Sequence, residues 1–352
     1  MSSSSAAALQ IPSRMKAAQF DQTGDVDVIQ VREVEVKQPG KGEILVKIEW
    51  GGVNFIDTYF RAGVYPAALP WTVGNEGAGV VVALGEGVSR SSHNYDVGSR
   101  VAVYTPGGSF AEYAVVKAEK AVELPEGLST RQAAAALTQG LTALTFVKEA
   151  HEVKEGQFVL VQAAAGGLGL LLVQLAKRFG ATVIGTTSTT EKAEIARKAG
   201  ADHVLLYGPD KWDEITQEVY RITGGEGPDT GVHVVFDGVG KDTFEADFGL
   251  LRRKGSLVSI GNASGKVPAV EPIKLGGKNL KLSRPVLNHY VHTLAEFQSY
   301  AKELFALVQD GSLNLAVHGE YEFSTEGVRQ TQRDITSRKT SGKLLVKIAG
   351  DA

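Results

Sequence analysis

The chain has 352 residues, of which 43% are hydrophobic and 22% are charged, a composition typical of a soluble globular protein. This length favours two domains over one. The formal net charge of −3 at pH 7 gives no general attraction for nucleic acid or for an acidic membrane. The chain contains no cysteine, which excludes disulfides, thiolate nucleophiles, iron–sulfur clusters and every zinc site built on cysteine.

The start of the chain predicts a flexible tail over residues 1–14. This segment is rich in Ser and Ala and lacks the basic region and long apolar core of a secretory signal. Folded sequence is expected to begin near Met15. The absence of cysteine suits a reducing compartment, so we expect a cytoplasmic protein.

From Lys16 to about Thr138 the sequence favours short strands. Residues 31–36 and 44–48 alternate apolar and charged side chains, and glycine and proline interrupt the segment at short intervals. This pattern predicts a small barrel-like domain. An Ala/Leu-rich run over residues 133–146 predicts a helix at the end of this domain.

From about Gln139 to Leu287 strands and helices alternate, which is typical of a doubly wound parallel sheet. The expected strands are Phe158–Ala163, Thr182–Thr186, His203–Tyr207, Val232–Asp237, Ser256–Ile260 and Leu280–Ser283. The expected helices between the first five are Leu168–Phe179, Glu191–Ala199, Lys211–Thr223 and Asp242–Arg253.

The C-terminal part predicts a helix over Tyr290–Gln309 and a last strand over Leu344–Ile348. We expect this strand to return to the first domain and make it discontinuous.

Residues 158–176 are long and apolar enough to suggest a membrane span. However, glycines and glutamines interrupt them, and a buried parallel strand also reads as an apolar run.

The most informative motif is the turn at residues 163–169, which reads Ala-Ala-Ala-Gly-Gly-Leu-Gly between an expected strand and an expected helix. A turn that approaches a pyrophosphate closely carries no large side chains on the approaching face. The helix that follows points its free N–H groups and positive dipole end at the phosphates. Because strand, turn, helix and strand follow in order, we predict a dinucleotide site. Its candidate binding residues in the turn are Ala165, Gly166, Gly167, Leu168 and Gly169.

The second strand of this unit indicates which dinucleotide binds. NAD sites place Asp or Glu at its end to bind the ribose 2′-OH. Here Thr187 and Ser188 supply hydroxyls, which donate to a 2′-phosphate, and Lys192 follows with a positive charge. Tyr207, after the third strand, is expected near the same phosphate. The sequence therefore favours NADPH, although Lys192 alone could be an ordinary solvated lysine.

Several motifs together resemble the medium-chain dehydrogenase/reductase superfamily, and within it the zinc-free quinone oxidoreductases that are similar to zeta-crystallin. They lie at residues 52–59, 74–79, 163–169, 236–240 and 259–262, with Arg284-Pro285 and Arg338 to Lys343 in addition. The resemblance implies an α/β fold with a GroES-like β-rich domain and a doubly wound Rossmann nucleotide-binding domain. The implied boundaries are 15–138 and 288–352 for the first and 139–287 for the second, with the active site between them.

The resemblance also bears on metal. Zinc alcohol dehydrogenases of this superfamily bind the catalytic ion through a Cys and a His, and the matching positions here are Asn54 and Asn75. Neutral amides are poor zinc ligands, so we expect no metal site. Without a Lewis acid the substrate must accept hydride readily, which favours quinones and activated enones.

The resemblance implies roles for residues of the cleft. Asn54, Tyr59 and Tyr65 are the candidate catalytic residues: Asn54 beside the nicotinamide ribose or substrate, and the tyrosines beside a quinone. Asn54 could instead cap its own turn, and the tyrosines could be core aromatics. Trp71 is expected to pack.

Further cofactor contacts are implied on the nicotinamide side and in the C-terminal segment. They are Thr138, Gly261, Asn262, Arg284 and Arg338, with Asn54 shared. The two arginines could instead form surface ion pairs. Asp237 is expected to cap the turn after its strand, and His289 and His292 are expected on a helix surface.

These observations predict an NADPH-dependent quinone reductase. One alternative is an enone or 2-alkenal reductase of the same fold. Another is an RNA-binding protein like some zeta-crystallin relatives, which the slight negative charge and the lack of an RNA-binding module disfavour. We expect a homodimer that pairs through the edge strand at Leu280–Ser283, because an exposed apolar edge needs covering.

Overall fold

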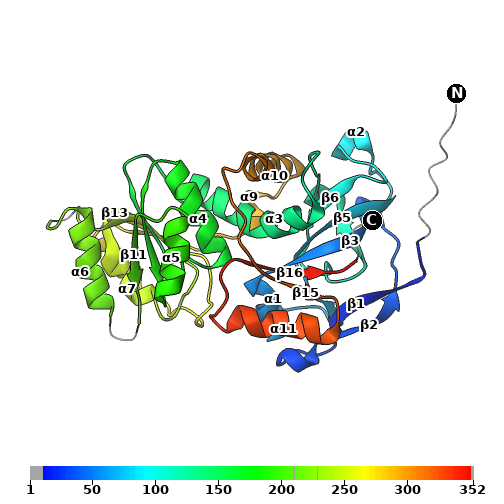
Figure 1. Cartoon of the computed structure of the whole chain (residues 1–352), viewed down its shortest axis with the longest axis horizontal. Coiled ribbons are helices and arrows are strands. Elements are labelled where there is room, and N and C mark those ends of the chain that lie inside the picture. The colour runs from blue at the N-terminus through cyan, green and yellow to red at the C-terminus, as the bar shows by residue number, and fades with distance from the viewer. Residues whose placement is uncertain (1–10, 209–210, 228, 350–352) are drawn as a thin grey trace.

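The structure, a computed structural model, describes residues 11–208, 211–227 and 229–349. Two large sheets lie at opposite ends of an elongated molecule, and helices fill the space between them (Figure 1). Within the described residues, no helix is long and apolar enough to cross a membrane. The predicted tail falls mostly outside the described residues, and the first strand begins at Arg14.

The first large sheet has six parallel strands in the order β11-β10-β9-β12-β13-β14. Its strands are β9 (Phe158–Val161), β10 (Thr182–Thr187), β11 (His203–Leu206), β12 (Val232–Asp237), β13 (Leu251–Ser259) and β14 (Lys281–Ser283). Its helices are α4 (Gly167–Arg178), α5 (Thr190–Lys198), α6 (Trp212–Thr223), α7 (Phe244–Leu250) and α8 (Ile273–Gly276). The chain runs outward from β9 in both directions, so β9 and β12 flank the point where the strand order reverses. A ligand of such a sheet binds at the carboxyl ends of these strands.

Two predicted helices differ from the structure. The helix expected over Asp242–Arg253 ends at Leu250, because Leu251 is buried and pairs with Val232 as the start of β13. Pairing in the sheet here outweighs the helical pattern of the run. The helix expected over Tyr290–Gln309 is two helices, α9 (Leu287–Tyr290) and α10 (Leu294–Gln309). Thr293 ends the gap between them by capping α10 in a reciprocal arrangement with Glu296.

The second large sheet has the order β15-β16-β3-β5-β6-β8, with β7 paired to β3. Its strands are β3 (Glu43–Val53), β5 (Glu76–Leu84), β6 (Arg100–Tyr104), β7 (Tyr113–Lys117), β8 (Ala121–Glu123), β15 (Val317–Glu322) and β16 (Lys343–Lys347). A smaller sheet joins β1 (Arg14–Phe20), β2 (Gln30–Glu35) and β4 (Trp71–Thr72). Because β16 pairs with β3, the C-terminal strand lies in the same sheet as the N-terminal part of the chain, as the sequence predicted.

The helices of this half are mostly short. They are α1 (Phe55–Arg61), α2 (Arg90–His93), α11 (Thr325–Thr336) and the 3-10 turns Val26–Val28 and Ala118–Lys120. A longer helix, α3 (Thr130–Thr145), continues as a π-helical turn over Phe146–Ala150. Ser129 caps α3 by accepting a hydrogen bond from Gln132 N.

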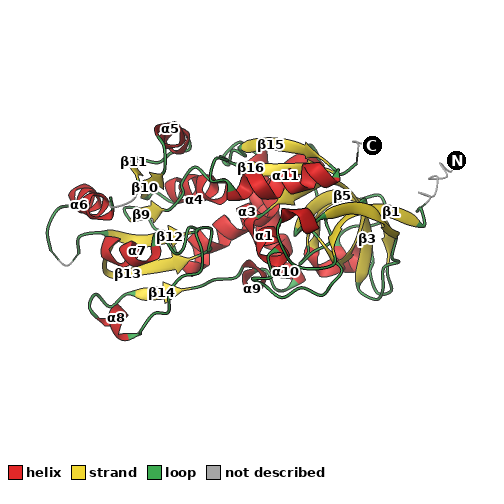
Figure 2. Cartoon of the chain, turned by 90° about the horizontal axis from the view of Figure 1, so that it is seen from below, coloured by secondary structure: helices red, strands yellow, loops and turns green. Residues whose placement is uncertain are grey.

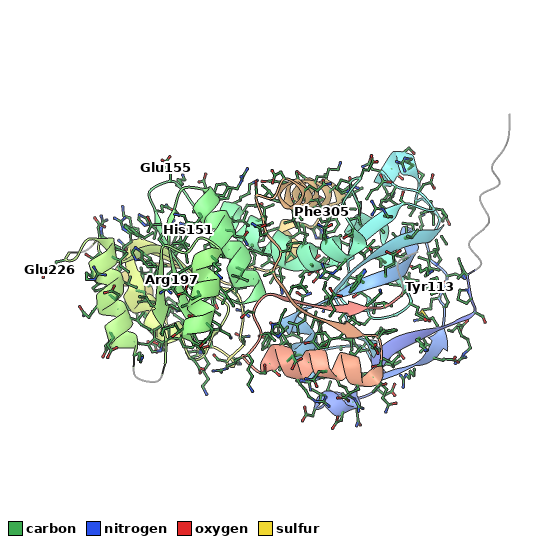
Figure 3. All side chains as sticks on the ribbon, viewed as in Figure 1. Tyr113, His151, Glu155, Arg197, Glu226 and Phe305 are labelled. Carbon is green, nitrogen blue, oxygen red and sulfur yellow. The ribbon has the colours of Figure 1, made fainter. Side chains whose placement is uncertain are left out.

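Helix α3 joins the two halves. It lies near the middle of the molecule (Figure 2) and contacts α4 and α10 as well as β3, β5 and β6. Its buried alanines and leucines belong to one apolar core that includes Trp50 of β3 and Val159 of β9. Phe305 of α10, labelled in Figure 3, is fully buried in the same core. The cleft described next is therefore bordered by elements that share one hydrophobic core.

Candidate active site

A cleft of about 530 Å³ lies between the carboxyl edge of the parallel sheet and the segment of α1. The sequence-predicted residues converge on it from distant parts of the chain. Those that line it are Asn54, Tyr59, Tyr65, Thr138, Ala165, Gly166, Gly167, Leu168, Gly169, Thr187, Ser188, Lys192, Tyr207, Gly261, Arg284 and Arg338. Asn262 does not line it but contacts Tyr59 through its backbone.

The floor of the cleft is the turn between β9 and α4. Ala163 adopts a left-handed conformation with φ of 52°, and α4 begins at Gly167, one residue before the predicted start. A Cβ atom on Gly169 would collide with the carbonyl oxygen of Ala163, and one on Gly167 would collide with Gln139. Glycine is therefore required at position 169, where the obstacle is backbone, whereas at position 167 the obstacle is the end of the flexible Gln139 side chain. The first-turn N–H groups of α4 are the ones an anion would meet.

One end of the cleft carries two cations and a hydroxyl. Lys192 and Ser188 line it from α5 and the end of β10, and Arg338 lines it from the segment after α11. The Lys192 ammonium donates to the backbone carbonyl of Arg338, while the Arg338 guanidinium pairs with Asp242 at 3.2 Å. Burial lowers the pKa of Lys192. Arg338 thus forms an ion pair, the alternative that the sequence allowed, while it also lines the cleft.

At the same end, Tyr207 lines the cleft directly after β11 and lies parallel to Trp212, with ring centroids 6.3 Å apart. Thr187 is the last residue of β10 and is buried. The strand therefore ends in a hydroxyl residue where an NAD-binding sheet would carry a carboxylate.

Another part of the cleft has an aromatic wall, which comes from α1 and the segment after it. The rings of Tyr59 and Tyr65 meet edge to face at 5.2 Å, and Phe55 approaches Tyr59 at 5.4 Å. Trp71 stacks on Phe60 at 4.7 Å, which confirms its packing role.

A hydrogen bond crosses the cleft from this wall. The backbone N–H of Asn262, after β13, donates to the Tyr59 hydroxyl oxygen at 2.9 Å. The hydroxyl hydrogen of Tyr59 is therefore free of this bond and available to another acceptor. Burial raises the pKa of Tyr59, and the N–H of Asn262 acts in the opposite direction.

Arg284 fixes the loop that carries Asn262. Its guanidinium donates to the carbonyl oxygens of Ser259 at 3.0 Å and Gly261 at 3.2 Å. In this structure its contacts thus hold the loop after β13 in place beside the cleft.

Thr138 presents an unused hydroxyl at the cleft. Its backbone N–H donates to Glu76 at 2.7 Å, but its side-chain oxygen is buried and has no hydrogen-bond partner among the described residues. A buried hydroxyl without a partner is costly, so a polar ligand group beside it would be stabilised.

A buried polar network lies behind the cleft. The ammonium of Lys343 pairs with Glu76 and donates to Asn54 Oδ1 at 3.0 Å, and Asn54 Nδ2 donates to Glu76 Oε1 at 2.6 Å. These bonds fix the orientation of the Asn54 amide. In the sequence Lys343 is only part of a motif and has no predicted role, because an isolated lysine is usually exposed.

Asp57 completes this network. It accepts a hydrogen bond from the Asn54 N–H at 2.9 Å and another from the side chain of Asn75. Burial raises the pKa of Asp57 to about 7.

These residues do not fit a catalytic zinc ion. The two positions that would supply ligands carry amides, and the nearby carboxylate of Glu76 is already paired with Lys343. Over residues 11–208, 211–227 and 229–349, no cluster of three or more His, Cys, Asp or Glu could hold a metal. His289 is exposed on α9 as predicted, whereas His292 is exposed between α9 and α10.

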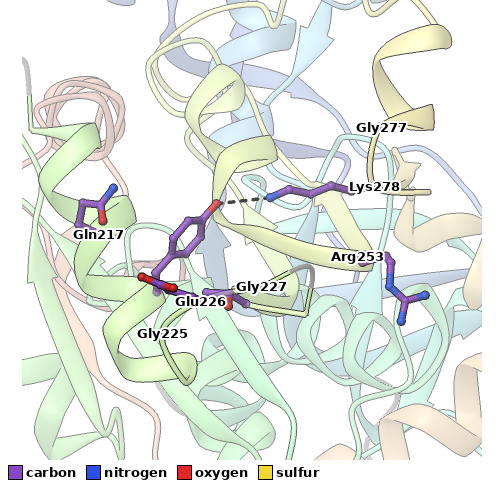
Figure 4. A pocket seen from close by; sticks show the side chains of 9 residues that line it. Gln217, Gly225, Glu226, Gly227, Arg253, Gly277 and Lys278 are labelled. Carbon is purple, nitrogen blue, oxygen red and sulfur yellow. Dashed lines mark hydrogen bonds between the residues drawn. The ribbon is translucent and has the colours of Figure 1, made fainter.

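A second hollow of about 350 Å³ lies beside the C-terminal part of α6 (Figure 4). Its most prominent cation, Lys278, donates to the carbonyl of Leu251 at 2.8 Å and to the hydroxyl of Tyr220 at 3.4 Å. The ammonium is thus used by the protein itself, and the hollow shares no residue with the cleft.

Two families of known proteins match two separate parts of the chain. Residues 40–126 match the family described as alcohol dehydrogenase GroES-like domain, and residues 167–306 match the family described as zinc-binding dehydrogenase. A probable quinone oxidoreductase of Schizosaccharomyces pombe is 39% identical over 329 residues, which cover 93% of this chain and 95% of that protein.

Solved structures extend this similarity. A mycobacterial protein complexed with NADPH is 41% identical, with a TM-score of 0.88 over 95% of this chain and 100% of its own. The quinone oxidoreductase of Escherichia coli complexed with NADPH is 36% identical, with a TM-score of 0.87 over 94% of this chain and 99% of its own.

Proposed function

The chain belongs to the quinone oxidoreductases of the medium-chain dehydrogenase/reductase superfamily, and on that premise we propose that it reduces quinones with NADPH. Its fold combines a GroES-like domain with a Rossmann-type nucleotide-binding domain. The observation that carries the proposal is the convergence, on one cleft, of a glycine turn, a cationic end and an aromatic wall.

The residues of the cleft fit NADPH. The first turn of α4 would hold the pyrophosphate, since the glycines keep side chains away from it. Ser188, Lys192 and Arg338 would hold the 2′-phosphate. The unpartnered hydroxyl of Thr138 would meet a polar group of the nicotinamide end.

When bound, NADPH supplies a hydride to an electron-poor acceptor. The rings of Tyr59 and Tyr65 provide a flat apolar surface against which a quinone can pack. The Tyr59 hydroxyl accepts the Asn262 N–H and so keeps its own hydrogen available for the oxygen of the reduced quinone. The remaining contribution of the protein is to orient the reactants and exclude water.

The proposed reaction does not use a zinc ion. Asn54 and Asn75 offer amides in place of ionised ligands, and the nearby Glu76 is paired with the ammonium of Lys343. Quinones suit such a site, because they accept reducing equivalents without a Lewis acid on their oxygen.

Three further assignments belong to the proposal. The GroES-like domain comprises residues 15–138 and 288–352, and the nucleotide-binding domain comprises residues 139–287. The protein acts in the cytoplasm. It forms a homodimer through β14, which is the last strand of its sheet, and the neighbouring helix α8 carries an exposed isoleucine.

The experiment that tests the function measures NADPH oxidation by the purified protein with 1,2- and 1,4-quinones, and with 2-alkenals in parallel. We expect turnover of quinones and a marked preference for NADPH over NADH. Turnover of alkenals with none of any quinone would assign the protein to the enone reductases instead.

A further inference from the structure

Two buried carboxyl groups face each other below the cleft. Asp237 ends β12 and Asp247 lies in α7, and both side chains are fully buried. Asp237 accepts hydrogen bonds from the backbone N–H groups of Val239 at 2.7 Å and Gly240 at 3.1 Å, and from the Thr243 hydroxyl at 2.9 Å. This confirms its predicted role as the cap of the turn after β12.

Asp247 is in a different position. Its Oδ1 accepts a hydrogen bond from the side-chain amide of Gln162 at 2.7 Å. Its Oδ2 is buried, and no N–H or hydroxyl of the described residues donates to it. The carboxyl of Asp237 lies near enough for its negative charge to act on Asp247.

Two buried carboxyl groups this near to each other are not both charged. Asp237 is already surrounded by donors, which stabilise its charge, so the proton belongs to Asp247. Burial raises the pKa of Asp247 well above its usual range, and the negative charge of Asp237 raises it further. Asp247 is thus a neutral acid beside the charged Asp237, and it accepts a hydrogen bond from Gln162.

This pair connects two walls of the cofactor cleft. Gln162 follows β9, lines the cleft and also accepts a hydrogen bond from Thr186 at the end of β10. Gly238 and Val239, in the turn capped by Asp237, line the cleft as well. The acid therefore sits where the ends of β9, β10 and β12 meet, at the reversal of strand order.

We infer that Asp247 is a positioning residue of the dinucleotide site, which holds Gln162 in place for NADPH and supports, beside Asp237, the turn at residues 238–240. The inference rests on the proposed function for its cofactor. It adds a residue that lies outside the cleft and to which the sequence gave no role.

The ionisable groups around α7 are engaged elsewhere. Glu245 pairs with Lys274 of α8 on the outer side, and Tyr220 of α6 donates to the carbonyl of Gly249. Arg252, which follows α7, pairs with Asp229. The protonation of Asp247 therefore depends on its burial and on Asp237 rather than on a surface ion pair.

The effect of pH has a definite sign. A carboxyl whose pKa is raised in the folded protein binds more protons folded than unfolded, between its ordinary pKa and the raised one. Stability therefore falls as pH rises through that window. Above the raised pKa the two charges repel, and the walls of the cleft lose their alignment.

The test compares Asp247→Asn, Asp247→Ala and the matched control Glu245→Gln on the same helix. Asparagine can donate to Asp237 and accept from Gln162 without a titratable proton. Two quantities are measured from pH 6 to 9: the melting temperature of the apoprotein and the Kd for NADPH, from fluorescence titration.

We expect the Ala variant to bind NADPH at least about tenfold more weakly at pH 7, since it leaves Gln162 without its acceptor. The Asn variant should stay within about threefold of wild type at pH 7. Its advantage over wild type in melting temperature should grow as pH rises, and its Kd should vary less with pH.

Wild-type affinity in the Ala variant would overturn the positioning role. Parallel melting profiles of wild type and the Asn variant would show that Asp247 is not a neutral acid in the folded protein. Failure of the wild-type protein to bind NADPH would overturn the proposed function and the positioning role with it. The apoprotein melting profiles would still show whether Asp247 is protonated in the folded protein.

Discussion

At the scale of single residues, the choice of cofactor depends on one ammonium group. Lys192 is the cation that α5 places at the end of β10, and its side chain reaches the carbonyl of Arg338 across the cleft. A charged hydrogen bond to a phosphate is about twice as strong as a neutral one. Lys192→Ala should therefore raise the Kd for NADPH about tenfold or more and leave that for NADH within about twofold.

The matched control is Lys198→Ala, at the exposed C-terminal end of the same helix. It removes the same charge from α5 outside the cleft. Binding of both cofactors, measured by calorimetry, should then equal that of wild type. Equal losses for NADH and NADPH in Lys192→Ala would contradict the phosphate assignment.

The proposed role of Tyr59 as a proton donor can be tested with a single substitution. Tyr59→Phe keeps the ring in the aromatic wall but removes the hydroxyl that accepts from Asn262 and faces the cleft. Because positioned proton transfer contributes about 100-fold or more, kcat for quinone reduction should fall at least tenfold. The Kd for NADPH should change by less than about threefold.

A solvent deuterium isotope effect on kcat separates proton transfer from packing. We expect such an effect in the wild-type protein and a changed one in Tyr59→Phe. Tyr113→Phe, on β7 and away from the cleft (Figure 3), serves as control. An unchanged kcat in Tyr59→Phe would assign the proton to water.

At the scale of elements, the turn between β9 and α4 sets the tightest steric limit. Gly169→Ala would press a methyl group against the Ala163 carbonyl, which is backbone and cannot move aside. Overpacking of this kind costs about 1–3 kcal/mol. The unfolding free energy, from urea titration, should fall by that amount, and NADPH binding should weaken.

Gly249→Ala in α7 is the matched substitution. No atom lies within 4 Å of the added methyl group, and alanine favours the helix. Its unfolding free energy should stay equal to wild type or rise by up to about 1 kcal/mol. Equal destabilisation in the two variants would mean that the turn does not depend on the close approach of α4.

The elements were also the most predictable part of the molecule. The strands β9 to β13 and the helices α4 to α6 follow from apolar runs and glycine turns within about ten residues of sequence. Long-range contacts were not predictable. Lys343 is buried because it meets Glu76, which is 267 residues away in the chain, and Asp247 is neutral because it is buried and Asp237 is beside it. No local pattern marks either charge as buried.

At the scale of the whole molecule, the cofactor cleft depends on contacts between the two halves. Tyr59 reaches the loop after β13, Lys192 reaches the carbonyl of Arg338, and the N–H of Asn314 donates to Gln174 at 2.8 Å. Since α3 packs between the two large sheets, these contacts are supported by a common core. The residues proposed to hold NADPH are thus contributed by segments that neither half could orient alone.

The outer edge of the parallel sheet leads to the prediction for assembly. Strand β14 has β13 on one side, and along the described chain no strand pairs with its other side. Helix α8 lies beside it (Figure 2), and its Ile273 is 81% exposed. An unpaired strand edge with an exposed apolar side chain favours pairing with a second copy, which would continue the sheet across the interface.

Ile273→Glu should disrupt this association, because it places two carboxylates near each other across a two-fold axis and removes apolar contact. Light scattering should give the mass of two chains for the wild-type protein and of one chain for the variant at micromolar concentration. Val97→Glu provides the control, since Val97 is 51% exposed in the other half of the molecule, before β6. It should leave the wild-type mass unchanged. A dimer that survives Ile273→Glu but dissociates with Val97→Glu would move the interface from the edge of the nucleotide-binding sheet to the GroES-like half.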